Sequence, residues 1–131
     1  MTAIAVVPHT TEFPATPDTP HRGLARDTVG PFRIVVHVEG EADVSVIGDL
    51  RHALEYAAKR ARHAVVVDLR NTSFLGIRAA AVLAATEDTC RAAGIELHMV
   101  AGSRPVERVL EVVGVGTRSR VHSSMYAALR A

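Results

Sequence analysis

The 131-residue chain contains few of the residues that mark whole classes of protein. It has no tryptophan, and only 4% of its residues are aromatic, which argues against a nucleic-acid surface built on base stacking. Its single cysteine, Cys90, excludes an internal disulfide framework and fits a reducing compartment. Its 15 basic residues nearly balance its 14 acidic residues, so bulk charge does not favour nucleic acid or a membrane surface as a partner.

Long apolar segments are also missing. No run approaches the length that a membrane span needs, and the first residues lack the basic and apolar regions of a signal peptide. We therefore expect a cytoplasmic protein with one hydrophobic core. Lys59 is the only lysine, and such a bias toward arginine is associated with GC-rich bacterial genomes.

No set of residues has the spacing of a catalytic, nucleotide-binding or metal site, so we predict no enzyme activity, no cofactor and no metal. Gly114 and Gly116 lack the third glycine of a dinucleotide loop. The seven histidines show no ligand spacing, and His98 alternates with apolar residues as a half-buried structural residue does. Asp68 has two interpretations: it hydrogen-bonds the turn that follows, or it belongs to a site.

The chain divides by composition. Residues 1–22 hold four of the six prolines, which predicts a flexible Pro/Thr-rich tail, although residues 4–7 have the composition of a short strand. Residues 23–131 are predicted to form the folded domain.

Strand and helix patterns alternate along this domain. Strands are predicted at residues 24–27, 32–38, 65–67, 95–100 and 117–121, and helices at 46–61, 78–93, 105–113 and 123–129. Alternating units imply parallel strands covered by helices. We predict an α/β domain with a mixed central sheet of about four to five strands and helices mainly on one face.

Five segments, taken in order, carry a family resemblance: residues 38–43, 65–69, 73–83, 95–100 and 106–110. Together they resemble the STAS family, the domain shared by sulfate transporters and anti-sigma factor antagonists. The resemblance covers residues 24–129 and implies a STAS-like fold.

In the antagonist branch of that family, the second helix begins with Asp-Ser-Ser-Gly. The second serine is phosphorylated by a partner that is both a serine kinase and an anti-sigma factor. In this chain the four positions are Gly76, Ile77, Arg78 and Ala79, none of which has a hydroxyl group. The resemblance therefore implies a protein without the usual phosphoacceptor, whose place is taken by Arg78.

The same resemblance implies a partner-binding surface formed by Gly40, Glu41, Asp43, Gly76, Ile77, Arg78, Ala79 and Ala81. Our hypothesis is a non-enzymatic bacterial regulator that binds an anti-sigma factor, of the serine-kinase type or of another type, or a related protein. In this hypothesis, Arg78 either keeps the protein permanently able to bind its partner or redirects binding to a more acidic partner. Whether the protein forms a homodimer is left open. The alternative function is a STAS scaffold or a module that binds a small ligand or takes part in lipid trafficking.

Overall fold

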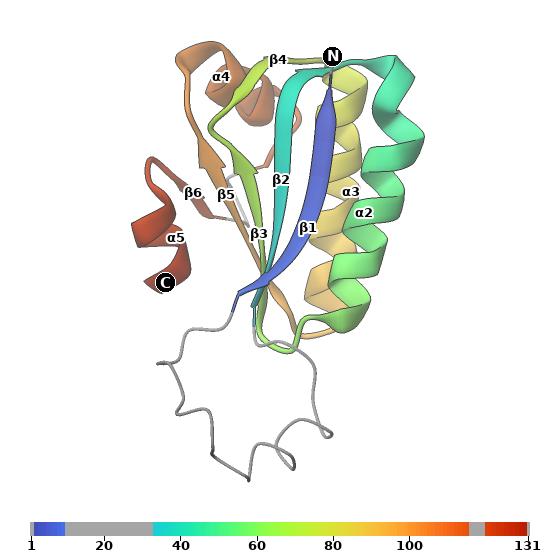
Figure 1. Ribbon diagram of the computed structural model, residues 1–131, viewed down its shortest axis with the longest axis vertical. Coiled ribbons are helices and arrows are strands. Elements are labelled where there is room, and N and C mark those ends of the chain that lie inside the picture. Colours follow the sequence, from blue (N-terminus) through green and yellow to red (C-terminus); the bar gives the residue numbers. More distant parts are fainter. Residues whose placement is uncertain (1, 10–32, 116–119, 131) are drawn as a thin grey trace, which may run out of the picture.

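The computed structural model describes residues 2–9, 33–115 and 120–130, where strands and helices alternate along the chain (Figure 1). The strands are β1 (Ala3–His9), β2 (Arg33–Ala42), β3 (Ala64–Leu69), β4 (Thr72–Leu75), β5 (Glu96–Ala101) and β6 (Arg120–His122). The helices are the short 3-10 helix η1 (Val44–Val46) and α2 (Ile47–Arg60), α3 (Ile77–Ala92), α4 (Arg104–Val112) and α5 (Met125–Arg130). In these segments no helix is both long and apolar enough to cross a membrane.

The strands form a mixed sheet in the order β1-β2-β3-β5-β6. β2, β3, β5 and β6 run parallel, as expected for strands joined by helices, while β1 runs antiparallel to β2 at the edge. β4 pairs with the far end of β2, from Gly40 to Ala42, and the pairing has an irregularity between Gly40 and Glu41. The predicted α/β class and mixed sheet are confirmed, and β4 raises the number of strands in the described residues to six.

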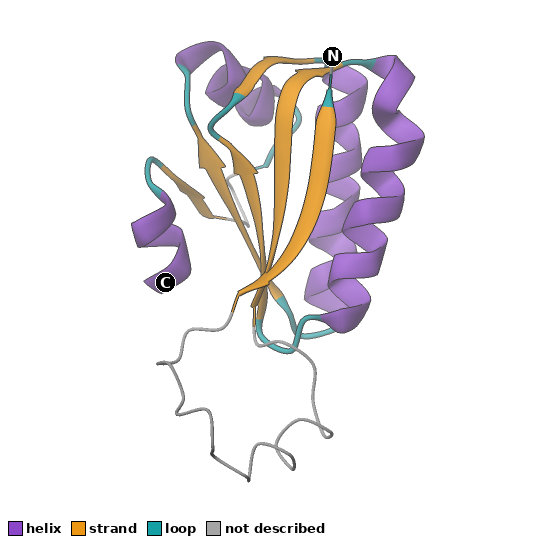
Figure 2. Cartoon of the chain, in the orientation of Figure 1, coloured by secondary structure: helices purple, strands orange, loops and turns teal. Residues whose placement is uncertain are grey.

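The two faces of the sheet belong to cores of unequal size. Ile34, Val36 and Val38 of β2 join the larger core, to which α2, α3 and α4 also contribute. Val35, which alternates with them, shares a smaller core with Ala128 of α5 on the opposite face. Figure 2 shows α2 and α3 along one side of the sheet and α5 on the other. The prediction that helices cover mainly one face is therefore confirmed.

Small residues bring α3 close to the sheet. Ala79 and Leu83 are fully buried, as is Cys90 near the other end of the helix. Burial raises the pKa of the Cys90 thiol to about 11. The helix ends where Gly94 adopts a φ of 75°, which favours glycine, and the N–H of Ile95 donates to the Cys90 carbonyl at 2.8 Å.

The N-terminus departs from the prediction. Residues 3–9, which their composition assigned to a tail, form β1 and pair with β2 from Ala3–Glu39 to His9–Arg33. The structure corrects the tail assignment for these residues and confirms the strand that the composition of residues 4–7 suggested, because pairing with a distant strand outweighs the neighbouring prolines. The predicted strand at 24–27 and the boundary between residues 22 and 23 lie outside the described residues.

Candidate functional site

The two segments that the family resemblance singled out lie side by side. The N–H of Gly40 donates to the Asn71 carbonyl at 3.0 Å, and the N–H of Gly76 donates to the Ala42 carbonyl at 2.9 Å. These bonds tie the end of β2 to β4 and to the residue that begins α3. Both segments therefore lie at one end of the sheet, where β4, α2 and α3 meet (Figure 1).

Asp43 holds the turn that follows β2. Its Oδ1 accepts hydrogen bonds from the N–H of Ser45 at 3.0 Å and from the Ser45 hydroxyl at 2.6 Å, which caps η1. These bonds favour the ionised carboxylate and lower the pKa of Asp43 from its ordinary value. Asp43 thus fixes the chain beside Gly76.

Helix α3 begins without a side-chain cap. Gly76 occupies the N-cap position, and the first turn contains no acidic residue. The first N–H groups of the helix therefore have no side-chain acceptor at the cap, and they form the positive end of the helix dipole. Arg78 adds a further positive charge there, so an acceptor or an anion from a partner is favoured at this position.

Large apolar side chains are exposed around this helix start. Val44 is 60% exposed, Phe74 is 53% exposed and Ile77 is 52% exposed. Exposed apolar groups bordered by polar ones are typical of protein-interaction surfaces. We define the α3-start surface as this apolar set and its exposed or half-buried neighbours: Glu41, Asp43, Val44, Phe74, Ile77, Arg78 and Ala81.

Two of the residues that the sequence predicts at this surface, Gly40 and Ala79, are not part of its exposed set. The side chain of Ala79 is 0% exposed and belongs to the core, so it is not available for direct contact. Gly40 is half-buried with a φ of 91°, which makes its role at the end of β2 conformational.

A groove of about 270 Å³ lies between α2 and α3, beside the α3-start surface. Its lining residues are Ile47, Arg51, Arg78, Ala81, Val82 and Ala85. The alanines leave room between the helices, and the two arginines make the groove positive because no carboxylate lines it. Such a groove fits an acidic and partly apolar segment of a partner.

Sequence reasoning missed three residues of this region. Val44 and Phe74 are large apolar residues of the kind that usually lies in a core, and only the fold shows their exposure. Arg51 could have been found from the sequence. It lies four residues after Ile47, and this spacing places both residues on one side of α2.

Asp68 has the structural role that was one of its two interpretations, although with different partners from those expected. It is buried at the end of β3 and accepts hydrogen bonds from the N–H, Nε and Nη2 of Arg70 at 2.9–3.0 Å. His37 Nδ1 lies 2.7 Å from its Oδ2. Burial opposes ionisation of this carboxyl, but the hydrogen bonds from Arg70 and His37 outweigh it and lower its pKa to about 2.

His98 is buried in a second polar cluster. Its Nε2 lies 2.9 Å from Glu96 Oε1, and its Nδ1 lies 2.9 Å from Nε2 of His122. The hydrogen bond from His98 lowers the pKa of Glu96, and burial lowers the pKa of His122. Within the described segments, no group of three or more His, Cys, Asp or Glu residues is arranged to hold a metal ion.

Comparison with known proteins matches this architecture to one family. A family model described as "Mlab, STAS domain" matches residues 30–125. The chain is 31% identical over 100 residues to the anti-sigma-F factor antagonist RsfA of Mycobacterium tuberculosis, a match that covers 75% of this chain and 78% of the relative.

Solved structures share the fold. An anti-sigma factor antagonist from Mycobacterium paratuberculosis has a TM-score of 0.76 at 21% identity, over 99% of this chain and 92% of that chain. The anti-sigma factor antagonist SpoIIAA in its unphosphorylated form has a TM-score of 0.63 at 17% identity, over 75% and 86%. The phosphorylated form of SpoIIAA, a Bacillus cell fate determinant, has a TM-score of 0.59 at 16% identity, over 76% and 90%. The chain belongs to the STAS domain family and, within it, to the family of anti-sigma factor antagonists.

Proposed function

We propose that this protein is a non-enzymatic bacterial regulator that binds an anti-sigma factor, or a related regulatory protein, through the α3-start surface. The observation that carries the proposal is the cluster of exposed apolar side chains around an uncapped helix start. Such a surface gains free energy when a partner covers its apolar groups and supplies an acceptor for the helix N–H groups. The partner class comes from the relatives, which are anti-sigma factor antagonists.

The charge of the neighbouring groove narrows the partner's chemistry. Arg51 and Arg78 line it together, and no acidic residue opposes them there. A partner segment that carries carboxylates and small apolar side chains fits this groove. Of the two roles considered for Arg78, the groove supports recognition of a more acidic partner.

The proposed interaction is not switched by phosphorylation at the helix start. SpoIIAA has a phosphorylated form, whereas residues 76–79 of this chain contain no hydroxyl group. Among the nearest hydroxyls, Thr72 is buried and donates to the Val38 carbonyl at 2.8 Å, while Ser73 is exposed. Binding is therefore expected to be independent of a serine kinase unless Ser73 is used.

Capture from an extract of the source organism, with matched baits, tests the binding surface. Ile77→Asp places a charge in the exposed apolar cluster, and Val112→Asp places the same charge on an exposed valine of α4. We expect the wild type and Val112→Asp to retain an anti-sigma factor, identified by mass spectrometry, that Ile77→Asp loses. Titration should then show a dissociation constant at least about tenfold higher for Ile77→Asp. Equal capture by all three baits contradicts the proposed surface, and capture of no anti-sigma factor contradicts the proposed function.

Incubation with ATP and the captured partner tests the absence of the switch. The wild type should gain no phosphate at residues 76–79, and a variant carrying Gly76→Asp, Ile77→Ser, Arg78→Ser and Ala79→Gly should be phosphorylated at position 78 if the partner is a serine kinase. The Cβ added at Gly76 would lie 3.3 Å from the Ala42 carbonyl, so a small local shift accommodates it. Phosphate on Ser73 of the wild type, with loss of binding, would show that the acceptor has moved to β4.

A further inference from the structure

β1 is one of the two edge strands of the sheet. One edge of this strand pairs with β2, and no strand of the described residues lies along the other edge. Residues 3–7 are Ala-Ile-Ala-Val-Val, without a charge, and only Pro8 lacks an N–H group. Natural edge strands are commonly protected by charges, because an uncharged edge is a template for a further strand.

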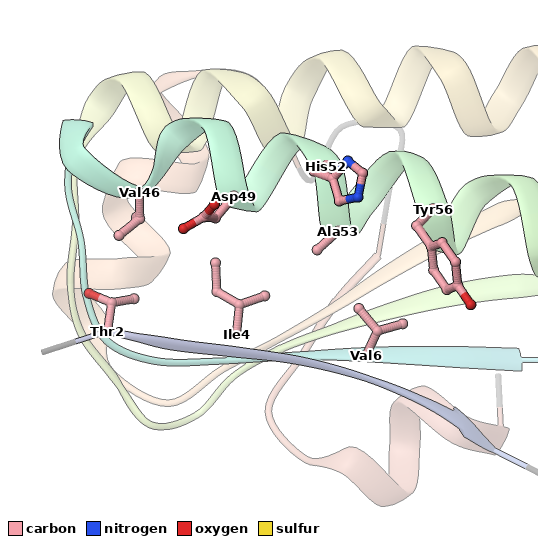
Figure 3. Close-up of a pocket in the computed structure, with 8 residues that line it drawn as sticks. All are labelled: Thr2, Ile4, Val6, Val46, Asp49, His52, Ala53 and Tyr56. Atoms are coloured by element: carbon pink, nitrogen blue, oxygen red, sulfur yellow. The ribbon is translucent and has the colours of Figure 1, made fainter.

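A groove of about 400 Å³ accompanies this edge on the side of α2. Figure 3 shows Ile4 and Val6 pointing from β1 toward α2, and Ala53 and Tyr56 pointing from α2 toward β1. Ile4 and Val6 are only half-buried and Tyr56 is exposed, so the apolar floor of the groove is incompletely covered. A strand added to β1 would place alternate side chains over this floor.

The β1 side of α2 carries opposite charges at its two ends. Asp49 lines the groove in the first turn, and Arg60 lies in the last turn, where its guanidinium carbon is 4.3 Å from the centre of the Tyr56 ring. Asp49, Ala53, Tyr56 and Arg60 recur at helical spacing, so they share one side of α2. We call this set the α2 stripe; it is acidic at one end and basic at the other.

We propose that two copies of this chain associate through the β1 edge and the α2 stripe, with β1 antiparallel to its copy. A two-fold axis beside β1 joins the two sheets into one and places the two α2 helices antiparallel on the same face. Asp49 of one copy then faces the end of α2 that carries Arg60 in the other, and the converse contact follows from symmetry. The half-covered Ile4, Val6 and Tyr56 of both copies become buried between the helices.

Self-complementarity selects a second copy over an unrelated extended peptide. An isologous interface requires one surface to satisfy itself after a two-fold rotation, and an uncharged strand beside a helix of opposite end charges meets this requirement. The α2 stripe also lies on a different side of α2 from Ile47 and Arg51, which line the groove beside α3. In the dimer, the groove between α2 and α3 of each copy therefore stays open. The dimer does not depend on the proposed function, and each can be tested without the other.

Charge reversal combined with sedimentation equilibrium tests the inference. The wild type should be a dimer, and Asp49→Arg and Arg60→Glu should each raise the dimer dissociation constant at least about tenfold. An equal mixture of these two variants should regain the dimer, because each repelling pair becomes an attracting pair. Arg51→Glu, on the α3 side of the same helix, is the matched control and should dimerise like the wild type.

Hydrogen exchange gives a second measurement without mutation. Amides of β1 that face the free edge should exchange more slowly in concentrated than in dilute wild-type protein. A monomer at every concentration, a dimer that both charge reversals leave intact, or a mixture that fails to recover would overturn the inference. Tight binding of an unrelated extended peptide to β1 by a monomeric wild type would assign the edge to a different occupant and overturn it as well.

Discussion

Two neighbouring helices begin in opposite ways. α4 has Ser103 at its N-cap, whose hydroxyl accepts from the N–H of Val106 at 3.4 Å, followed by Pro105 and by Glu107 in the first turn. α3 has Gly76 at its N-cap, no acidic residue in its first turn, and Arg78 at a position where the helix dipole disfavours a cation.

The difference separates a helix start that is stabilised by its own side chains from one whose first N–H groups have no side-chain acceptor at the cap. α4 also begins with a cation, Arg104, but its serine cap, its proline and the acidic residue in its first turn are features that stabilise an isolated helix terminus. The α3 start forgoes all of them and is surrounded by exposed Phe74, Ile77 and Val44. We therefore expect the first turn of α3 to be less stable than that of α4, and a partner that covers this end of α3 would supply the missing acceptor for its N–H groups.

The largest expected effects test whether the two helices differ only at their starts. Leu83 of α3 and Leu110 of α4 are both buried in the larger core. Leu83→Ala and Leu110→Ala should each lower the free energy of unfolding by about 2–5 kcal/mol, measured by chemical denaturation. If Leu83→Ala leaves the free energy of unfolding nearly unchanged, α3 is loosely packed along its whole length. Its weak start would then not distinguish it from α4.

A smaller effect is expected from the carboxylates near the same end of the sheet, where buried Asp68 contrasts with Asp43. The pKa of Asp68 is lowered from 3.8 to about 2, so its stabilising contribution is present above pH 4 and lost as the pH falls toward 2. Asp68→Asn should lower the free energy of unfolding by about 2 kcal/mol at pH 7. The gap between wild type and variant should narrow at pH 2–3, and an equal gap at both pH values would show that Asp68 acts by packing alone.

Cap exchange tests the comparison directly. Ser103→Ala should cost about 1 kcal/mol, because it removes the α4 cap. Gly76→Asp should change stability by only a few tenths of a kcal/mol, since the new cap is offset by the close contact of its Cβ with the Ala42 carbonyl. Thermal denaturation of both variants measures these changes in stability. If Gly76→Asp lowers the free energy of unfolding by about 1 kcal/mol or more, this position has no room for a side chain.

A small gain in stability is expected for Arg78→Glu. The change replaces an unfavourable charge at the positive end of α3 by a favourable one, which should raise stability by about 0.3–1 kcal/mol. The same variant should bind the proposed acidic partner at least about tenfold more weakly. Improved stability with unchanged binding would exclude Arg78 from the interface.

Much of the fold was predictable because its helices and buried strands have strong patterns. The predicted helix at 78–93 and the observed Ile77–Ala92 differ by one residue at each end. β4 was missed because it has four residues, of which Ser73 and Phe74 are exposed, and only its pairing with β2 defines it. β1 was anticipated only as a possible short strand at residues 4–7, since its partner in β2 lies far along the chain and the surrounding residues 1–22 are rich in proline.

The site was predictable only in part, and only by way of the family resemblance. Residues 40–43 and 76–81 share no pattern that places them together; the bond from Gly76 to the Ala42 carbonyl does so. The burial of Ala79 and the exposure of Phe74 depend on the exact orientation of α3 and β4. A pattern of apolar residues does not distinguish such an exposed residue from one in the core.

Burial of Cys90 makes its thiol a natural probe of local unfolding in α3. Burial raises the pKa of this thiol to about 11, so it is almost wholly protonated at pH 7 in the closed protein, and the sulfur is also shielded from reagents. A thiol-labelling reagent therefore reacts almost entirely with molecules in which this part of α3 has transiently opened. The labelling rate in native buffer reports the free energy of that opening without a mutation or a dye. A partner that binds around Ile77, at the other end of the helix, should slow the labelling of Cys90. The labelling rate therefore reports whether the partner is bound.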